Sequence, residues 1–142
     1  MSSKGQKHHN KENVNIETAN HKIYFGDARA VLKEYIGTES VQLTVTSPPY
    51  WNVRDYGAYG QIGFGDTLEQ YLANLDTVWQ EVARVLLPDG KLAVNIGNIY
   101  YSEPDEKRRT TANLTLLIWE RLNLLPDLRF MGTIYWQKTT SR

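Results

Sequence analysis

The sequence predicts an α/β fold with a mostly parallel sheet and flanking helices. Two observations predict this class. From residue 23 onward, short apolar runs alternate with stretches of helical periodicity, and Gly, Pro and Asp residues separate them, as in parallel sheets whose strands are joined by helices. The 142 residues suffice for one domain of ordinary size or for a piece of a larger one.

The first half of the pattern begins with an expected strand at 23–25, which Gly26-Asp27 closes. A helix is expected over 28–36, where apolar residues recur at helical spacing and Gly37 follows as a stop signal. The next strand is expected at 41–46. It ends abruptly at Ser47-Pro48-Pro49, because neither proline can donate a hydrogen bond to a neighbouring strand.

The second half starts with the strongest helical signal, an apolar stripe over 68–86 with a capping box formed by Thr67 and Gln70. Pro88-Asp89-Gly90 predicts a turn into a strand at 92–96. The remaining expected elements are a polar loop at 98–110, a helix over 114–125 and a last strand at 130–136.

The composition excludes several kinds of chemistry. There is no cysteine, which removes disulfides, thiolate metal ligands and sulfur nucleophiles. The three histidines, His8, His9 and His21, all precede the expected fold, which argues against a Ser-His-Asp mechanism. We therefore expect no metal site and no covalent enzyme intermediate.

Residues 1–22 are predicted to form a flexible polar leader, followed by a folded part from 23 to 142. The leader carries four lysines and two glutamates, so the folded part has more acidic than basic residues although the whole chain is neutral. A complete nucleic-acid enzyme usually has a basic face, and the composition of residues 23–142 does not indicate one.

No apolar run approaches the roughly 20 residues of a membrane helix, and the leader lacks the apolar centre of a signal peptide. We expect a cytoplasmic protein with no membrane partner.

The segment Ser47-Pro48-Pro49-Tyr50 follows a strand of the expected parallel sheet, at the edge where α/β folds gather ligands. Pro49 forces Pro48 into extended backbone, which leaves the Pro48 carbonyl as a free acceptor beside the Ser47 hydroxyl. Two acceptors on a rigid corner suit an –NH₂ group, and Tyr50 offers a ring face for stacking a planar base. An ordinary Pro-Pro turn with a packed aromatic residue is the alternative.

This tetrad resembles the signature of the amino-directed DNA methyltransferases that use S-adenosylmethionine, in which Ser, Asp or Asn precedes Pro-Pro and an aromatic residue. The resemblance spans about residues 23–138 and includes Gly26-Asp27, the stretch from Trp51 to Gly57, Gln61-Ile62-Gly63, Arg84-Val85-Leu86 with Pro88-Asp89-Gly90, Asn95-Ile96-Gly97 and Trp136-Gln137-Lys138. The order of these blocks is similar to the permuted group, whose catalytic half comes first. It implies a partial Rossmann-like methyltransferase fold.

The resemblance also implies a reaction. Ser47, Pro48, Pro49 and Tyr50 would form the catalytic corner, which accepts the protons of an exocyclic amine on a base flipped out of duplex DNA. Serine at the first position is more typical of cytosine-N4 enzymes and aspartate of adenine-N6 enzymes. We therefore expect a site-specific modification methyltransferase of the cytosine-N4 type, with adenine-N6 as the alternative.

Five further residues receive roles from the same resemblance. Asp27 and Ala28 would lie near the adenosine end of S-adenosylmethionine, although Asp27 also suits a helix N-terminus. Trp51 and Arg54 begin a glycine-rich loop at 51–66 that could close over double-stranded DNA, with Arg54 reaching a phosphate or a base edge. An exposed arginine that makes no specific contact is the alternative. Trp136 would lie beside the flipped base, with a buried strand position as the alternative.

The family's glycine-rich cofactor turn, of the type F-x-G-x-G after a strand, has no counterpart here. Gly63-Phe64-Gly65 is the only G-x-G, and it follows a loop. We expect residues 23–142 to be the catalytic half of a methyltransferase, inactive alone and completed by a C-terminal half or a second polypeptide. The other readings are a non-catalytic nucleic-acid-binding remnant, and a Rossmann-like protein or RNA methyltransferase that shares the tetrad.

Overall fold

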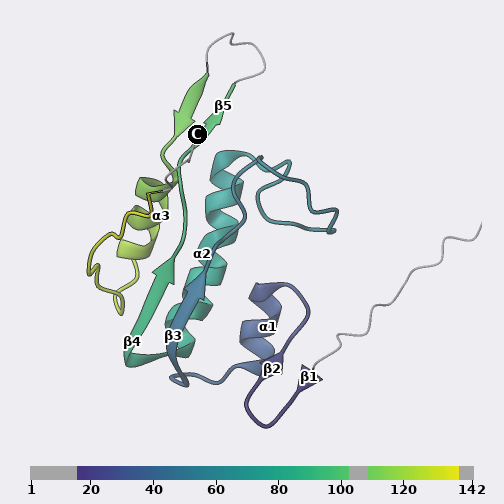
Figure 1. Cartoon of the computed structure of the whole chain (residues 1–142), viewed down its shortest axis with the longest axis vertical. Helices are drawn as coiled ribbons and strands as arrows, with labels where there is room; N and C mark the ends of the chain where they lie inside the picture. Colours follow the sequence, from purple (N-terminus) through teal and green to yellow (C-terminus); the bar gives the residue numbers. More distant parts are fainter. Residues whose placement is uncertain (1–15, 103–108, 138–142) are drawn as a thin grey trace, which may run out of the picture.

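The computed structural model describes residues 16–102 and 109–137. They form an α/β arrangement of helices and short sheets (Figure 1). The helices are α1 (Ala28–Tyr35), α2 (Leu68–Val85) and α3 (Leu114–Asn123). The strands are β1 (Ile16–Glu17), β2 (Lys22–Ile23), β3 (Val41–Thr46), β4 (Leu86–Val94), β5 (Ile99–Tyr101) and β6 (Thr110–Ala112).

The central sheet is the parallel pair β3 and β4, joined by a crossover that contains α2. Leu43 lies opposite Lys91 and Thr46 opposite Val94, so both strands end at the same edge. The register shifts between Val41 and Leu43, where Gly90 comes close to the neighbouring backbone. A Cβ at Gly90 would lie 2.9 Å from the Leu87 carbonyl oxygen and 3.1 Å from that of Val41, so only glycine fits there.

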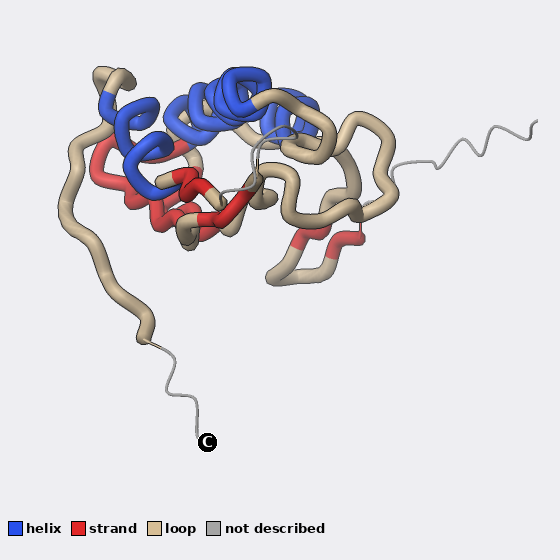
Figure 2. Tube along the Cα trace, turned by 90° about the horizontal axis from the view of Figure 1, so that it is seen from above, coloured by secondary structure: helices blue, strands red, loops and turns tan. Residues whose placement is uncertain are grey.

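Helix α2 is the centre of the core. It begins with the predicted capping box, in which the Thr67 side chain accepts from the Gln70 amide and the Gln70 side chain accepts from the Thr67 amide. Its apolar stripe is buried against α1, α3 and β4, and the helices form a layer on one side of the β3–β4 pair (Figure 2). Burial of each large apolar side chain contributes roughly 1.5–3 kcal/mol. The most deeply buried side chains are Trp79, Tyr71, Leu75, Leu114, Ile118 and Val85.

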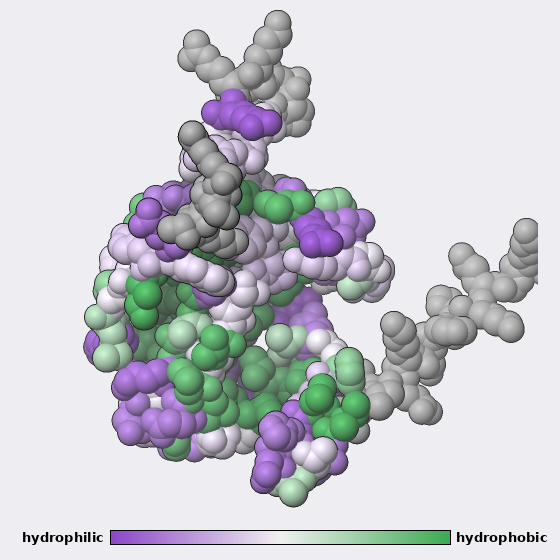
Figure 3. Space-filling model, in the orientation of Figure 1, coloured by the Kyte–Doolittle hydropathy of each residue, from purple (hydrophilic) through white to green (hydrophobic). Residues whose placement is uncertain are grey.

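The opposite face of the β3–β4 pair is uncovered within the described residues. Leu43 is 55% exposed and Val45 is 69% exposed, although both lie in a strand of the central sheet. Figure 3 has the same orientation as Figure 1, and in it apolar surface extends over the region of these strands. Parallel sheets are ordinarily covered on both faces, so this surface is suited to burial against further structure.

The α/β class is confirmed. The helices expected at 28–36, 68–86 and 114–125 are confirmed, with small differences at their ends, and so is the strand expected at 41–46. The expected turn at 88–90 is part of β4, which begins at Leu86. No described helix is long and apolar enough to span a lipid bilayer.

Three predicted segments were wrong. The strand expected at 23–25 is the two-residue β2, which pairs antiparallel with β1, so that residues 16–22 of the predicted leader belong to a hairpin. The loop expected at 98–110 contains β5 and begins β6, which pair with each other. The strand expected at 130–136 has no regular structure, because no described strand pairs with it. Residues 1–15 of the leader lie outside the described part of the chain.

We predict that Arg84→Met lowers the free energy of unfolding by about 1–3 kcal/mol, because the hydrogen bonds of the charged Arg84 guanidinium are lost. The Arg84 guanidinium, on α2, donates to the carbonyls of Leu32 (2.9 Å) and Ile36 (3.0 Å) at the end of α1, and to Thr38 Oγ1 (3.0 Å). Urea unfolding measures the change. Lys33→Met, at an exposed position of α1, is the control and should change stability by less than about 0.5 kcal/mol.

Candidate active site

The segment Ser47–Tyr50 forms a corner at the carboxyl end of β3. The parallel ladder continues to the last residue of the strand, where the Asn95 amide donates to the Thr46 carbonyl at 2.8 Å. Beyond that bond the chain has no amide to donate at the two prolines. Ser47 is exposed, Pro48 is buried, and Pro49 and Tyr50 are half-buried.

The oxygens of this corner fall into two groups. The Pro49 carbonyl accepts from the Tyr71 hydroxyl at 2.8 Å, and the Tyr50 carbonyl accepts from the Val53 amide at 3.4 Å. Among the described residues, Ser47 Oγ and the Pro48 carbonyl oxygen accept no hydrogen bond from the protein. The two oxygens that the sequence predicts as acceptors for an amine therefore keep that capacity.

Tyr50 and Tyr71 both contact the surroundings of the corner, Tyr71 through the Pro49 carbonyl and Tyr50 through the chain near Gly97. A Cβ at Gly97 would lie 3.5 Å from Tyr50 Oη, which puts the phenol against the chain that follows β4. The Tyr50 side chain is only half-buried, so part of it remains open to a ligand. Burial raises the pKa of the Tyr71 hydroxyl to about 12, and the nearby Tyr50 contributes in the same direction. Tyr71 therefore stays protonated and donates its hydrogen bond across the physiological pH range.

The loop 51–66 is closed at its base by Asp66. The Asp66 carbonyl accepts from Trp51 Nε1 (2.8 Å) and Asn52 Nδ2 (3.0 Å), and its carboxylate accepts from the Gly63 amide (2.8 Å). Asn52 adds bonds to the backbone of Gly63 and Gly65, both 2.7 Å. The two ends of the loop are thus held together directly beside the Ser47–Tyr50 corner.

The tip of this loop is exposed but internally braced. The Gln61 side chain donates to the Arg54 carbonyl and accepts from the Tyr56 amide, each at 2.7 Å. The Arg54 guanidinium lies 5.7 Å from the centre of the Tyr56 ring. Tyr59 is fully exposed. The tip therefore presents an arginine and two aromatic rings to solvent in an ordered arrangement.

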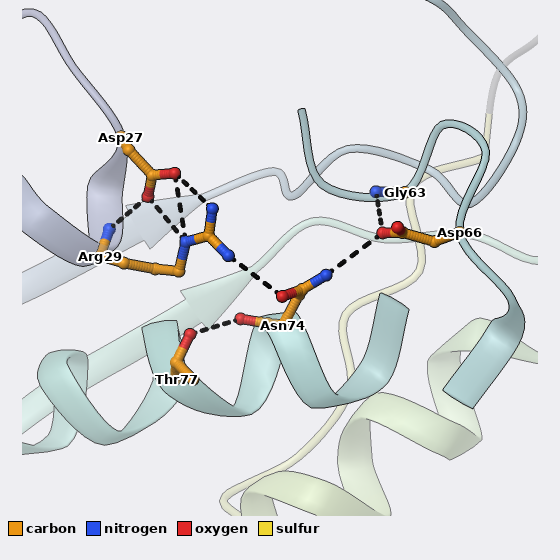
Figure 4. A network of polar contacts seen from close by, with 6 residues as sticks. All are labelled: Asp27, Arg29, Gly63, Asp66, Asn74 and Thr77. Carbon is orange, nitrogen blue, oxygen red and sulfur yellow. Dashed lines mark hydrogen bonds and ion pairs between the residues drawn. The ribbon is translucent and has the colours of Figure 1, made fainter. Parts of the chain in front are cut away.

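A chain of polar contacts connects α1 to this loop (Figure 4). Asp27 is the N-cap of α1 and accepts from the Arg29 amide at 2.8 Å and from the Arg29 guanidinium. The hydrogen bond from that guanidinium holds the pKa of the Asp27 carboxyl below its usual value. Arg29 Nη1 donates to Asn74 Oδ1 at 3.0 Å, and Asn74 Nδ2 donates to Asp66 Oδ2 at 3.3 Å.

The predicted site residues are therefore distributed unevenly. The corner residues are together, and the loop that begins with Trp51 and contains Arg54 is adjacent to them. Trp51 itself is buried, and its ring packs edge-on against Tyr101 at 5.0 Å, so its side chain anchors the loop; the predicted DNA contact by Trp51 stays a prediction. Ala28 follows Asp27 at an exposed position, and Trp136 is 78% exposed in the segment after α3.

Four residues of this arrangement were missed by the sequence analysis. Tyr71 lies on the apolar stripe of α2 and gave only a core signal. Arg29, Asp66 and Asn74 carry no signal alone, since their roles depend on contacts between distant segments. A partial signal existed for Asp66, because an acidic residue directly before a capping box is well placed to bind loop amides. Within residues 16–102 and 109–137 no group of acidic or histidine side chains could hold a metal ion.

Comparison with known proteins decides the family. A family model described as DNA methylase, of the N6/N4 class, matches residues 41–141. The chain belongs to this amino-methyltransferase family. The match begins at the first residue of β3 and includes the corner, the loop 51–66 and the whole of α2 and α3.

Several relatives are Type II methyltransferases. M.Cfr9I of Citrobacter freundii is 41% identical over 113 residues, which are 75% of this chain and 37% of that protein. M.XycI of Xanthomonas campestris pv. cyanopsidis is 44% identical over 96 residues, which are 63% of this chain and 32% of that protein. The chain thus spans about a third of the length of the curated relatives that it matches.

A solved structure of this family confirms the fold. The protein TTHA0409 of Thermus thermophilus, named as a DNA modification methylase, was crystallised with S-adenosyl-L-methionine. Its structure matches this one with a TM-score of 0.54 and 37% identity, over 69% of this chain and 36% of that chain. The Rossmann-like methyltransferase fold predicted from the sequence is therefore correct for the part of the fold that this chain contains.

We predict that Asp66→Ala opens the base of the loop and speeds tryptic cleavage after Arg54 by at least about fivefold, because local opening exposes the backbone to the protease. The substitution removes the carboxylate that accepts hydrogen bonds from the Gly63 amide and the Asn74 side chain. Limited proteolysis followed by mass spectrometry measures the rate. Asp89→Ala, at an exposed position of β4, is the matched control. An unchanged rate in Asp66→Ala would show that the loop is held without this carboxylate.

Proposed function

We propose that this chain provides the base-binding and amine-activating part of an S-adenosylmethionine-dependent DNA methyltransferase. The observation that carries the proposal is the pair of unengaged acceptors, Ser47 Oγ and the Pro48 carbonyl, at the carboxyl edge of a parallel sheet. The family match and the Type II methyltransferase relatives support it.

The proposed chemistry follows from the weakness of an exocyclic amine as a nucleophile. Its lone pair is delocalised into the base, and acceptors for both of its protons increase the electron density on nitrogen. Ser47 and Pro48 would accept these protons while the base stacks on the accessible part of Tyr50. The nitrogen attacks the methyl group of S-adenosylmethionine, the carbon–sulfur bond breaks, and the nitrogen loses one proton to water, to leave a methylated base and S-adenosylhomocysteine.

Cytosine-N4 is the proposed target within this class. The preference rests on Ser47, since serine at the first position of the tetrad resembles the cytosine-N4 enzymes. Adenine-N6 is the alternative, because both amines offer the same two protons to the corner. Either base must leave the duplex to reach these acceptors, at a cost of a few kcal/mol that stacking partly offsets.

Asp27 is the proposed contact to the adenosine end of the methyl donor, together with the neighbouring Ala28. The Asp27 carboxyl is partly exposed, and its hydrogen bond from Arg29 lowers its pKa, which favours the carboxylate form. A carboxylate offers about four lone-pair directions, so it can accept from a ligand hydroxyl or amine while it remains bound to Arg29. The relative from Thermus thermophilus that contains S-adenosylmethionine supports this cofactor.

Double-stranded DNA is the proposed partner of the loop tip. Arg54 is exposed and forms no ion pair with a described residue, so its guanidinium is available for a phosphate or a base edge. The adjacent Tyr56 ring lies under it. Trp136 is proposed to lie near the flipped base.

The cofactor site is proposed to be completed by a segment with the glycine-rich turn, as a continuation of this chain or as a second polypeptide. Two observations support this. The curated relatives are about three times as long as the part that this chain matches, and the face of β3 with Leu43 and Val45 is uncovered in the described residues. A further layer on that face would bury both side chains.

The test is a methyl-transfer assay with the full chain, labelled S-adenosylmethionine and duplex DNA. It is run alone and with a polypeptide that carries the unmatched remainder of M.Cfr9I. We expect N4-methylcytosine in the nucleoside digest of the mixture and at least about a hundredfold less product with Ser47→Ala, since one of the two acceptors is lost.

Thr44→Ala, in the strand β3 that precedes the corner, is the control and should retain most of the activity. N6-methyladenine in place of N4-methylcytosine would correct the target base. Transfer that persists in Ser47→Ala would contradict the proposed role of the corner. A chain that binds DNA but transfers no methyl group in either mixture would be a non-catalytic remnant.

A further inference from the structure

The carbonyl of Pro49 is held by a side chain from a different element. Tyr71 lies in the first turn of α2, has no exposed surface, and donates from its hydroxyl to the Pro49 carbonyl at 2.8 Å. Among the described residues, Tyr71 is the only one whose side chain forms a hydrogen bond with the backbone of the Ser47–Tyr50 corner. The corner is therefore tied to the best-packed helix of the core through one hydroxyl group.

This bond acts on the part of the corner that is not already fixed. The rings of Pro48 and Pro49 set φ at both residues, but the orientation of the Pro49 carbonyl depends on its ψ angle. Neither proline has an amide that could join the ladder of β3. A hydrogen bond to the Pro49 carbonyl fixes that angle, and with it the direction in which Tyr50 leaves the corner.

Tyr71 is itself held in one position by the loop 51–66. A Cβ at Gly63 would lie 3.2 Å from Tyr71 Cδ2 and 3.3 Å from Cε2, and Gly63 has a φ of +94°. Glycine therefore allows the base of the loop to lie directly against the Tyr71 ring. The same loop base is closed by Asp66, so the loop, the corner and α2 meet at this ring.

We propose that Tyr71 is a positioning residue for methyl transfer: its hydroxyl holds the Pro49 carbonyl and so fixes the direction in which Tyr50 leaves the corner, which places the Tyr50 ring to stack on a base whose –NH₂ group lies at Ser47 Oγ and the Pro48 carbonyl. This inference rests on the proposed function, and it adds a residue from outside the tetrad. The raised pKa of Tyr71 keeps the donor proton in place throughout an ordinary assay range.

A purely structural tyrosine is the competing explanation, because a buried phenol normally has a hydrogen-bond partner. The two explanations differ in what the hydroxyl does for the reaction. A structural role affects stability alone. A positioning role affects the turnover rate of a protein that is folded and has bound both substrates.

The kinetic test is Tyr71→Phe, which keeps the ring against Gly63 and removes only the hydroxyl. In the active form of the protein, alone or with the complementing polypeptide, we expect kcat to fall about tenfold while KM for S-adenosylmethionine and for DNA changes less than twofold. Tyr100→Phe, on an exposed position of β5, is the matched control and should leave kcat unchanged. An unchanged kcat in Tyr71→Phe overturns the inference and leaves the proposed function intact.

A second measurement needs no turnover. In the full chain with ¹³C-labelled proline carbonyls, the five prolines give separate signals, and Tyr71→Phe should shift the Pro49 signal most, because it loses its donor. An unmoved Pro49 signal means that the bond is absent and overturns the inference. No methyl transfer by the wild-type chain in either form overturns the proposed function and the inference with it.

Discussion

The end of β3 at a pair of prolines is the constraint on which the rest of this site depends. A parallel strand normally continues its ladder of amide donors, but Pro48 and Pro49 have none, and the ladder stops at the bond from the Asn95 amide to the Thr46 carbonyl. Beyond that bond, the backbone and side-chain oxygens at the corner have no partner in the ladder. The protein binds two of them internally, those of Pro49 and Tyr50, and leaves Ser47 Oγ and the Pro48 carbonyl for another donor.

Helix α2 makes that corner rigid and connects it to everything around it. Its first turn carries Tyr71, which binds the corner, and its second turn carries Asn74, which links the Asp27–Arg29 pair to Asp66. Burial of its apolar stripe stabilises the described structure. The proposed cofactor contact, the proposed DNA loop and the proposed base site are therefore attached to one helix, so that a disturbance of α2 would affect all three.

Local signals predicted the parts of the fold that depend on neighbouring residues. The C-terminal end of β3 follows from the two prolines, and the start of α2 follows from Thr67 and Gln70. Pairing between distant segments was not readable. The hairpin of β5 and β6 lies in a polar stretch without alternation, and the apolar segment 130–136 forms no strand because it has no described partner. The tetrad predicted the corner, whereas Tyr71 was hidden within an apolar stripe, where its ring and its hydroxyl have separate functions.

The central claim is that the free oxygens of Ser47 and Pro48 bind an amine, and a titration of the labelled full chain followed by NMR tests it most directly. The ligands are 1-methylcytosine, which has the exocyclic amine, and 1-methyluracil, which has a carbonyl oxygen at the same ring position. The account predicts that 1-methylcytosine shifts the signals of Ser47 and of the Pro48 carbonyl and that 1-methyluracil leaves them unchanged. Equal shifts with both ligands, or no shift at the corner with either, would contradict it.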